Sequence, residues 1–248
     1  MSGHSKWSTI KHKKGAADAK RGRIFTRLIK EITVAARMGG GDSVSNPRLR
    51  AAIQEAKSEN MSKDKIERAI KKGTGELESI QYEEVIYEGY GPGGAAVLIE
   101  SVTDNKNRAV ADIRHILSKA GGNLGAAGCV AWMFEKKGYI VVEGVKINEE
   151  SLMEVAIDSG AEDVREDDGN YEIITDPTDF EQVKKAIGGH SIPCLTAEIT
   201  MLPRSTLRIE GKEAEQMIKL METFEECEDV QKVYTNADIP QEVVDSIG

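Results

Sequence analysis

Few residues of the kinds that build metal sites, disulfide frameworks or nucleophilic centres occur in the sequence. There are only three cysteines in 248 residues, Cys129, Cys194 and Cys227, and they lie far apart without a CxxC pair. That number and spacing give neither a disulfide framework nor a zinc site, and they fit a reducing compartment. The four histidines show no HxxxH or HExxH spacing. We therefore expect no metal and no cofactor.

Long apolar runs are missing as well. No stretch approaches the roughly 20 apolar residues of a membrane-spanning helix. The N-terminus is basic, but no apolar run of about 7–15 residues follows it, so a signal peptide is not expected. We expect a cytoplasmic protein that does not contact a membrane.

Charge is distributed unevenly along the chain. The net charge is −9, yet residues 1–75 contain 18 Lys and Arg against 7 Asp and Glu, a net charge of +11. The first thirty residues contain nine Lys or Arg against one acid, Asp18, and almost no apolar residue before Ile24. Such a segment cannot fold around a core of its own, and its like charges repel one another. A cationic arm of this kind is typical of polyanion binding, and we expect it to bind nucleic acid.

Contacts from such an arm go mostly to phosphates, so they give affinity and salt dependence but little sequence information. Trp7 and His12 lie among the basic residues, and their rings are of the kind that stacks on bases or sugars. No helix-turn-helix, zinc-finger, RRM or KH signature is present that would read bases. The predicted nucleic-acid-binding residues are Lys6, Trp7, Lys11, His12, Lys13, Lys14, Lys20, Arg21, Arg23, Arg27, Arg48, Arg50, Lys57, Lys63, Lys65 and Arg68.

Three short amphipathic helices are predicted at the end of the arm and directly after it. The first has an apolar stripe with its basic residues mostly off that stripe, and it ends at the glycines 39–41. Asn46 and Pro47 have the N-cap and first-turn preferences of a second helix. Ser62 and Gly73 are predicted to cap the two ends of a third. Short loops between them indicate a small helical bundle with basic outer faces.

Beyond the bundle, strands and helices alternate, which indicates an α+β fold with helices packed on sheets. We predict strands at 82–90, 95–102, 129–134, 138–142, 161–167, 171–176, 197–203 and 230–237, and helices at 106–120, 148–160, 178–189 and 212–227. The expected architecture is an N-terminal three-helix basic bundle followed by two ferredoxin-like α/β domains, one of them discontinuous.

The expected domain boundaries follow from the order of these elements. The basic arm and bundle cover 1–75, a discontinuous α/β domain covers 76–135 plus 204–248, and an α/β domain covering 136–203 is inserted into it. The insert contains 15 Asp and Glu against 6 Lys and Arg, so it is a poor candidate for phosphate contact.

The remaining motifs are interpreted as structural. GYGPGG (89–94) fits neither GxGxxG nor a P-loop and precedes a strand, so we interpret it as a tight turn. GGNLG (121–125) is interpreted as a helix C-cap and connector. Cys129 begins an apolar strand without a base nearby, and Asp167 and Asp168 lie at an acidic hairpin tip. Because these motifs contain no catalytic constellation, we expect no enzymatic activity.

Several stretches together resemble the YebC/PmpR family, whose mitochondrial members include the translational activator of cytochrome c oxidase. They are GHSKW (3–7), NPRLRAAIQEAKSENMSKDKIERAIKKG (46–73), YEGYGPGG (87–94), TDNKNR (103–108) and GGNLGAAGCVAWMF (121–134). The resemblance covers essentially the whole chain and implies a helical N-terminal bundle and two α/β domains. Cys129 and Ser62 depart from the residues expected in many members, Ser and Pro respectively, and neither lies in the basic arm.

Two functions are implied by this resemblance, and both use the basic N-terminal region on nucleic acid. Some members are described as DNA-binding transcriptional regulators, and others as ribosome-associated translation factors that relieve stalling, notably on proline-rich stretches. The expected partners are therefore DNA or ribosomal RNA, with the ribosome as a further candidate, and the protein is expected to act as a monomer. The missing base-reading motif and the flexible glycines of the arm, Gly15 and Gly22, favour RNA slightly.

An alternative hypothesis is that the acidic α/β part of the chain, after the bundle, performs the function. In that case this part would dock a protein partner, such as a ribosomal protein, and the arm would only steer the encounter. Charge reversal within 162–168 would distinguish the two hypotheses, because it would abolish docking and leave nucleic-acid binding intact.

Overall fold

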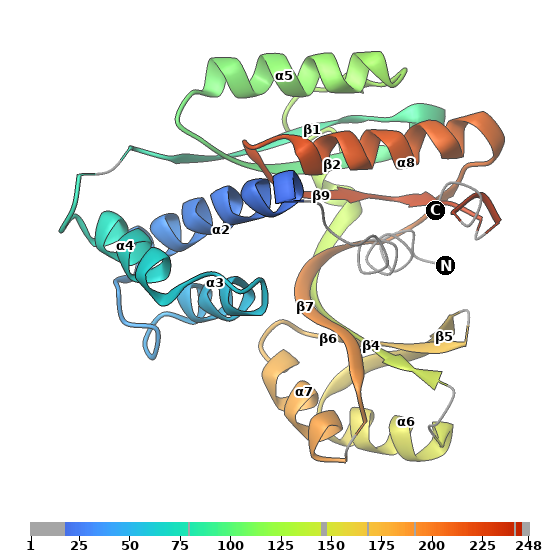
Figure 1. The fold of residues 1–248 in the computed structure, drawn as a ribbon. Coiled ribbons are helices and arrows are strands. Elements are labelled where there is room, and N and C mark those ends of the chain that lie inside the picture. Colours follow the sequence, from blue (N-terminus) through green and yellow to red (C-terminus); the bar gives the residue numbers. More distant parts are fainter. Residues whose placement is uncertain are drawn as a thin grey trace. The chain divides into compact units, whose positions relative to one another are not determined.

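The structure is a computed structural model that describes residues 18–78, 80–144, 148–167, 169–190, 192–240 and 242–244 (Figure 1). Its contacts divide these residues into two compact units. The smaller unit contains Trp132–Arg208 and Asn236–Asp238. The larger unit contains the preceding residues up to Ala131, together with Ile209–Thr235 and 239–244. The predicted division into three domains stays a prediction, and each unit is described by itself.

A three-helix bundle forms the first part of the larger unit. It consists of α2 (Asp18–Gly39), α3 (Pro47–Ser58) and α4 (Lys63–Thr74). Its core is made of the apolar stripes that the sequence shows on each helix, among them Ile32, Leu49 and Ile66. Residues of α2 meet those of α4 in the same chain order, since Thr33 bonds the carbonyl of Ala69 and Phe25 lies under Lys65. These two helices therefore run parallel, with α3 returning between them.

Asn46 joins α2 to α3. Its side chain accepts a hydrogen bond from the N–H of Leu49 at 3.0 Å, which confirms the predicted N-cap. Its amide also donates to the carbonyls of Ala35, at 2.8 Å, and Gly40, at 2.9 Å, so one buried side chain satisfies groups at both helix ends. Asn46 therefore fixes the angle between the two helices as well as the start of α3.

Replacing Asn46 with Ala should lower the free energy of unfolding by about 1–2 kcal/mol, because the cap and two carbonyl partners are lost together. Urea unfolding followed by circular dichroism measures this change. Ser62→Ala is the matched control, since Ser62 lies at the N-cap position of α4 but its side chain makes no capping bond. An equal loss at both positions would contradict the role assigned to Asn46.

Ser62 lies at the N-cap position of α4 as predicted, whereas the predicted C-cap at Gly73 is wrong. Ser62 makes no side-chain cap, and the left-handed residue that ends the helix is Gly75, with φ of 84°. Gly73 lies inside α4, where a Cβ atom would come within 2.4 Å of the carbonyl oxygen of Thr33. This glycine is needed for the close approach of α4 to α2, not for a turn.

The first sheet completes the larger unit. Strands β1 (Glu83–Tyr90), β2 (Ala96–Thr103), β3 (Asn123–Leu124) and β9 (Val230–Thr235) pair antiparallel in the order β3-β1-β2-β9. Helices α5 (Lys106–Lys119) and α8 (Gly211–Glu226) pack beside each other on the strands (Figure 1). The turn between β1 and β2 includes the short helix η1 (Pro92–Gly94). Gly91 and Gly93 of this turn lie close to α8, since a Cβ at Gly91 would reach within 2.6 Å of Met217 and one at Gly93 within 3.0 Å of Glu213.

The smaller unit is built on a second antiparallel sheet. In chain order it contains β4 (Phe134–Glu143), α6 (Glu149–Asp158), β5 (Ala161–Asp167), β6 (Asn170–Thr175), α7 (Phe180–Gly189) and β7 (Cys194–Pro203), followed by β8 (Leu207–Arg208), which pairs with β10 (Ala237–Asp238). The strand order β5-β6-β4-β7 is that of a ferredoxin-like βαββαβ unit. Ile140, Ile173 and Phe180 belong to the core between the sheet and its two helices.

Both units are thus α+β, as predicted, although the first sheet has a different strand order from the second. Two local predictions are corrected. The strand predicted at 129–134 is a turn followed by the short helix η2 (Ala131–Met133), and only Phe134 belongs to β4, which also contains the strand predicted at 138–142. The segment GGNLG is more than a connector, because Asn123 and Leu124 form β3 against β1.

Candidate nucleic-acid interface

The predicted binding residues divide into three groups. Lys6, Trp7, Lys11, His12, Lys13 and Lys14 lie outside the described residues. Lys20 and Arg21 belong to the first turns of α2, and their side chains are not among those described. The remaining ones, Arg23, Arg27, Arg48, Arg50, Lys57, Lys63, Lys65 and Arg68, lie on the three bundle helices.

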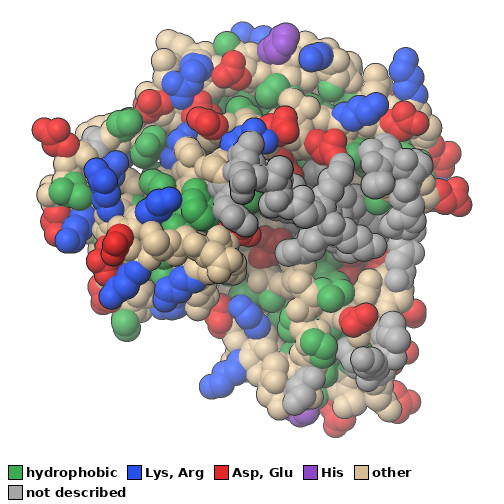
Figure 2. Space-filling model, viewed as in Figure 1, with side chains coloured by type: hydrophobic (Ala, Val, Ile, Leu, Met, Phe, Trp, Pro, Cys, Tyr) green, Lys and Arg blue, Asp and Glu red, His purple; other side chains and the backbone are tan. Residues whose placement is uncertain are grey.

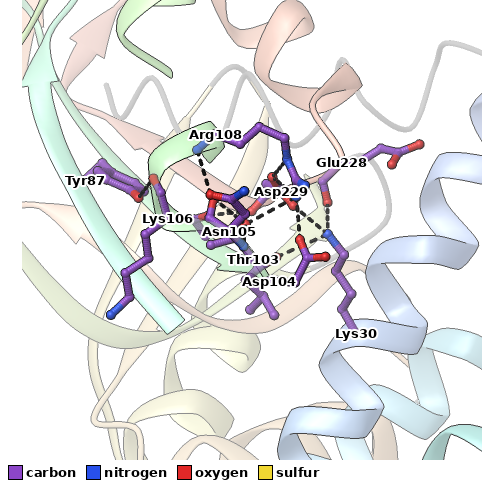
Figure 3. Close-up of polar contacts among 11 residues, drawn as sticks. Lys30, Tyr87, Thr103, Asp104, Asn105, Lys106, Arg108, Glu228 and Asp229 are labelled. Atoms are coloured by element: carbon purple, nitrogen blue, oxygen red, sulfur yellow. Dashed lines mark hydrogen bonds and ion pairs between the residues drawn. The ribbon is translucent and has the colours of Figure 1, made fainter. Parts of the chain in front are cut away.

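Helix α2 has one apolar face and one basic face. Its apolar residues pack into the bundle, whereas Arg23, Arg27 and Lys30 are spaced i, i+4 and i+7 and form a second stripe. Lys30 is buried, and its ammonium group donates to the carbonyls of Val102 at 3.2 Å and Glu228 at 2.9 Å and to the carboxylate of Asp229 at 2.8 Å (Figure 3). All three protons of the ammonium group have partners. This lysine therefore joins the bundle to the first sheet.

Asp229 is shared with α5. Its second carboxylate oxygen accepts from Arg108 at 3.1 Å (Nε) and 2.8 Å (Nη2), and Arg108 also pairs with Asp104 (Figure 3). Burial by itself would raise the pKa of Asp229, but the hydrogen bonds from Lys30 and Arg108 outweigh it and hold the pKa below its ordinary value. The TDNKNR motif thus supplies an ion-pair network, with Asn105 as the N-cap of α5.

The other two members of the α2 stripe also face carboxylates. Arg23 lies 3.4 Å from Glu226, at the C-terminal end of α8. Burial lowers the pKa of Arg27, and the charges of Glu225 and Glu55 partly offset that effect. The stripe therefore follows residues 225–229, hereafter the acidic turn, from its exposed end at Glu226 to its buried end at Asp229.

Arg48 is also bound by carboxylates of the same chain. Its guanidinium donates to both carboxylate oxygens of Glu31, at 2.7 and 2.9 Å, and to Glu84 at 2.6 and 3.2 Å. These contacts raise its pKa. Arg50 donates to the carbonyls of Ser43 and Val44, both at 3.1 Å, in the loop between α2 and α3. Arg48 in particular connects α2, α3 and β1, which is a structural role.

The exposed cations lie on the end of α3 and on α4. Lys57, Lys63, Lys65 and Arg68 are all exposed, and Figure 2 shows Lys and Arg side chains gathered over the part of the molecule that contains these helices, with several acids between them. On α4, Lys65, Arg68 and Lys72 are spaced i, i+3 and i+7, which places them within a sector of about 60°. Lys65 also lies 5.0 Å above the ring of Phe25.

Two cations of α4 were not selected from the sequence. Lys71 is exposed and Lys72 half-buried, and both lie in the last turn of the helix. Their helical spacing from Lys65 and Arg68 would have identified them from the sequence. Because α2 and α4 run parallel, the positive ends of both helix dipoles lie at the end of the bundle where the basic arm enters.

The glycine-rich motifs contain an anion-binding loop whose backbone N–H groups bind a carboxylate of the same chain. The buried carboxylate of Glu88 accepts the N–H groups of Gly128 at 2.6 Å, Val130 at 2.8 Å and Ala131 at 2.7 Å. Burial would raise the pKa of Glu88, but these three bonds outweigh it and lower the pKa. They also keep residues 128–131 out of a strand. Burial and the charge of Glu88 raise the pKa of Cys129, so its thiol is not activated as a nucleophile.

The ferredoxin-like sheet does not offer an RNA-stacking platform. On its central strands β4 and β6, the face away from the helices carries Tyr139, Val141, Glu172 and Ile174. The phenol of Tyr139 donates to the carboxylate of Glu172, and both side chains are buried. A carboxylate beside the only aromatic ring of these two central strands on this face opposes phosphate binding there.

The described part of the chain has neither a cluster of metal-ligating side chains nor a membrane-spanning helix. Within it, no three His, Cys, Asp or Glu side chains come together in a group able to hold a metal ion. No helix among the same residues has the length and apolar character needed to cross a bilayer.

Comparison with known proteins agrees with the sequence motifs. Residues 5–76 match the TACO1/YebC protein N-terminal domain, and residues 82–237 match the TACO1/YebC second and third domain. A probable transcriptional regulatory protein of Desulforapulum autotrophicum is 63% identical over 247 residues, covering 100% of both chains. One of Syntrophobacter fumaroxidans is 60% identical over 248 residues, again with 100% coverage of both.

A solved structure agrees in fold as well. The crystal structure of a conserved hypothetical protein from Aquifex aeolicus superposes with a TM-score of 0.80 at 50% sequence identity, and the match covers 93% of this chain and 96% of that one. Its α+β architecture, the two domain matches and the full-length relatives lead to one conclusion. The chain belongs to the TACO1/YebC family.

Proposed function

We propose that this protein is a nucleic-acid-binding regulator of gene expression without enzymatic activity, and that it binds through phosphates. Its relatives carry the name of probable transcriptional regulatory proteins, which supports a regulator. The observation that carries the proposal is the segregation of charge, +11 in residues 1–75 within a chain of net charge −9. The exposed lysines of α3 and α4 extend that charge from the arm onto the bundle.

Binding of this kind holds the backbone of the nucleic acid and does not read its bases. The α4 stripe, Lys65, Arg68 and Lys72, contains cations only, which suits contact with successive phosphates, and it has no Asn or Gln to read adenine. The proposed role as a DNA-binding transcriptional regulator therefore needs a second source of specificity, such as DNA shape. The alternative is a ribosome-associated translation factor that binds ribosomal RNA and relieves stalling, and the absence of a groove-reading sequence motif slightly favours it.

Substituting Ala for Lys65, Arg68 and Lys72 together should weaken binding to a duplex DNA and to an RNA hairpin of equal length. Removing up to three phosphate contacts should reduce the slope of log K against log salt by about 2–3 and the affinity roughly tenfold or more at 0.1 M salt. Fluorescence anisotropy over a salt series measures both quantities. Comparison of the two probes in the wild-type protein shows which nucleic acid is preferred.

The matched control is the triple substitution Lys119→Ala, Lys212→Ala and Lys219→Ala. These lysines are exposed on α5 and α8 of the same unit, and the control removes the same charge. If both triple variants lose affinity equally, the effect is one of net charge and the proposed interface is wrong. If neither loses affinity, the bundle face takes no part in binding.

A further inference from the structure

The basic stripe of α2 and the acidic turn form a series of charge pairs whose burial changes along the helix. At one end the side chains of Lys30 and Asp229 are only 8% and 6% exposed. At the other end those of Arg23 and Glu226 are 31% and 68% exposed. Arg27 lies between them along α2 and is half-buried. The pairing is therefore fixed at Asp229 and open to solvent at Glu226.

The acids of this turn are placed where they do not help their own helix. The last turn of α8 contains no basic residue, although cations are favoured at a helix C-terminus. Glu222 and Glu226 are also spaced i and i+4, which places like charges beside each other. Because these acids oppose the stability of α8, we infer that they have a role outside the helix.

We propose that Glu226 is a displaceable carboxylate that pairs with Arg23 until a nucleic-acid phosphate replaces it, and that Glu225 adds negative charge beside this pair. The acidic turn then sets the affinity of the nucleic-acid site, and this inference rests on the proposed function. Guanidinium groups bind carboxylate and phosphate with the same two-pronged geometry, so one can substitute for the other.

The exposed end of the series is the end that exchanges. An ion pair in solvent contributes little, so transferring Arg23 from Glu226 to a phosphate costs little. The buried pair of Lys30 and Asp229 cannot exchange in this way, because separating it would leave an unpaired charge in the protein interior. Phosphate binding therefore releases the end of α8 without detaching α2 from the sheet.

The test uses the full-length protein with Glu225→Gln and Glu226→Gln. Anisotropy with a duplex DNA and an RNA hairpin should show binding that is about twofold to tenfold tighter at 0.1 M salt, and this difference should shrink as salt rises. The matched control, Glu215→Gln with Glu181→Gln, removes two exposed carboxylates elsewhere, and its affinity should change much less. Adding Arg23→Gln and Arg27→Gln to the first variant should abolish the gain. Thermal unfolding by circular dichroism confirms that each variant is folded.

Several results would overturn the inference. The first variant could bind no more tightly than the wild-type protein, the control could tighten binding by the same factor, or the gain could persist without Arg23 and Arg27. Each of these leaves the proposed function standing if the wild-type protein binds. Failure of the wild-type protein and all variants to bind either probe would instead refute the proposed function, and this inference with it.

Discussion

Deleting residues 2–22 should reduce nucleic-acid affinity on the order of a hundredfold to a thousandfold at 0.1 M salt. The deletion removes Lys6, Lys11, Lys13, Lys14, Lys20 and Arg21 against a single acid, Asp18. If most of these cations contact phosphates, the slope of log K against log salt should fall by about 4–5. The fold should be retained, because the packed residues of α2 begin at Ile24. Anisotropy over a salt series and a thermal unfolding curve measure the two effects.

A full-length variant in which the same six cations are replaced with Gln separates charge from chain length. It should lose nearly as much affinity as the deletion, and any remaining difference is the contribution of Trp7 and His12. Binding of the truncated protein to DNA and to ribosomes as well as the full chain would refute the assignment of the arm. Binding by the Gln variant as tight as wild type would refute the phosphate mechanism.

The helices of the bundle could be predicted from the sequence because their determinants are local. An apolar stripe, an Asn-Pro start and glycines at the ends lie within a few residues of the structures they specify. Gly73 shows the limit of such reasoning. A glycine near a helix end fits a C-cap and a close helix contact equally well, and the choice depends on the carbonyl of Thr33, forty residues earlier.

The candidate interface shows the same limit more strongly. The sequence places Arg23, Arg27 and Lys30 off the apolar stripe of α2, which suggests a solvated face. The carboxylates that pair with Arg23 and Lys30 are those of Glu226 and Asp229, about 200 positions away, and no local pattern reveals that pairing. Arg48 is similar, since one of its two carboxylates is on β1. Lys65 and Arg68 of the α4 stripe were predicted from the sequence, and the same helical spacing would also have identified Lys72.

The pairing of α2 with the acidic turn changes how the arm relates to the rest of the chain. The arm leads directly into a helix that is joined to the first sheet by a buried ion pair. The bundle is therefore held to the sheet by buried side-chain contacts as well as by the connecting chain. The basic N-terminal part and the acidic C-terminal part of the sequence thus meet inside that unit, as ion pairs between α2 and the acidic turn.

The largest expected loss of stability comes from breaking this ion pair. Lys30→Met should lower the free energy of unfolding by about 3–5 kcal/mol, because it leaves Asp229 and two carbonyls buried with fewer partners. Asp229→Asn should cost a comparable amount, since Lys30 and Arg108 both lose a carboxylate. Urea unfolding measures these changes. Lys63→Met is the matched control, because the Lys63 pair with Glu67 is exposed and its loss should cost less than about 0.5 kcal/mol.

The pH dependence of stability gives a second reading of the same pair. The folded-state pKa of Asp229 is below its ordinary value of 3.8, so its contribution is fully present above that value. It is lost as pH falls through the depressed folded-state pKa. Wild-type stability should therefore decline more steeply below about pH 4 than that of Asp229→Asn, which lacks the titrating group. Parallel curves for the two proteins would show that Asp229 has the same pKa folded and unfolded.

Substitution of Lys30 also tests whether a basic residue contributes to nucleic-acid binding through its charge alone or only when its side chain is exposed. It is one of the nine Lys and Arg in the first thirty residues, yet its ammonium group is buried and fully bonded. Lys30→Met should therefore leave the salt dependence of nucleic-acid binding unchanged under conditions where the variant is folded, whereas removing an arm lysine should lower it by about 0.7–0.9 per contact. An equal drop in slope for both would mean that Lys30 leaves Asp229 to contact phosphate, and that the bundle detaches from the sheet on binding.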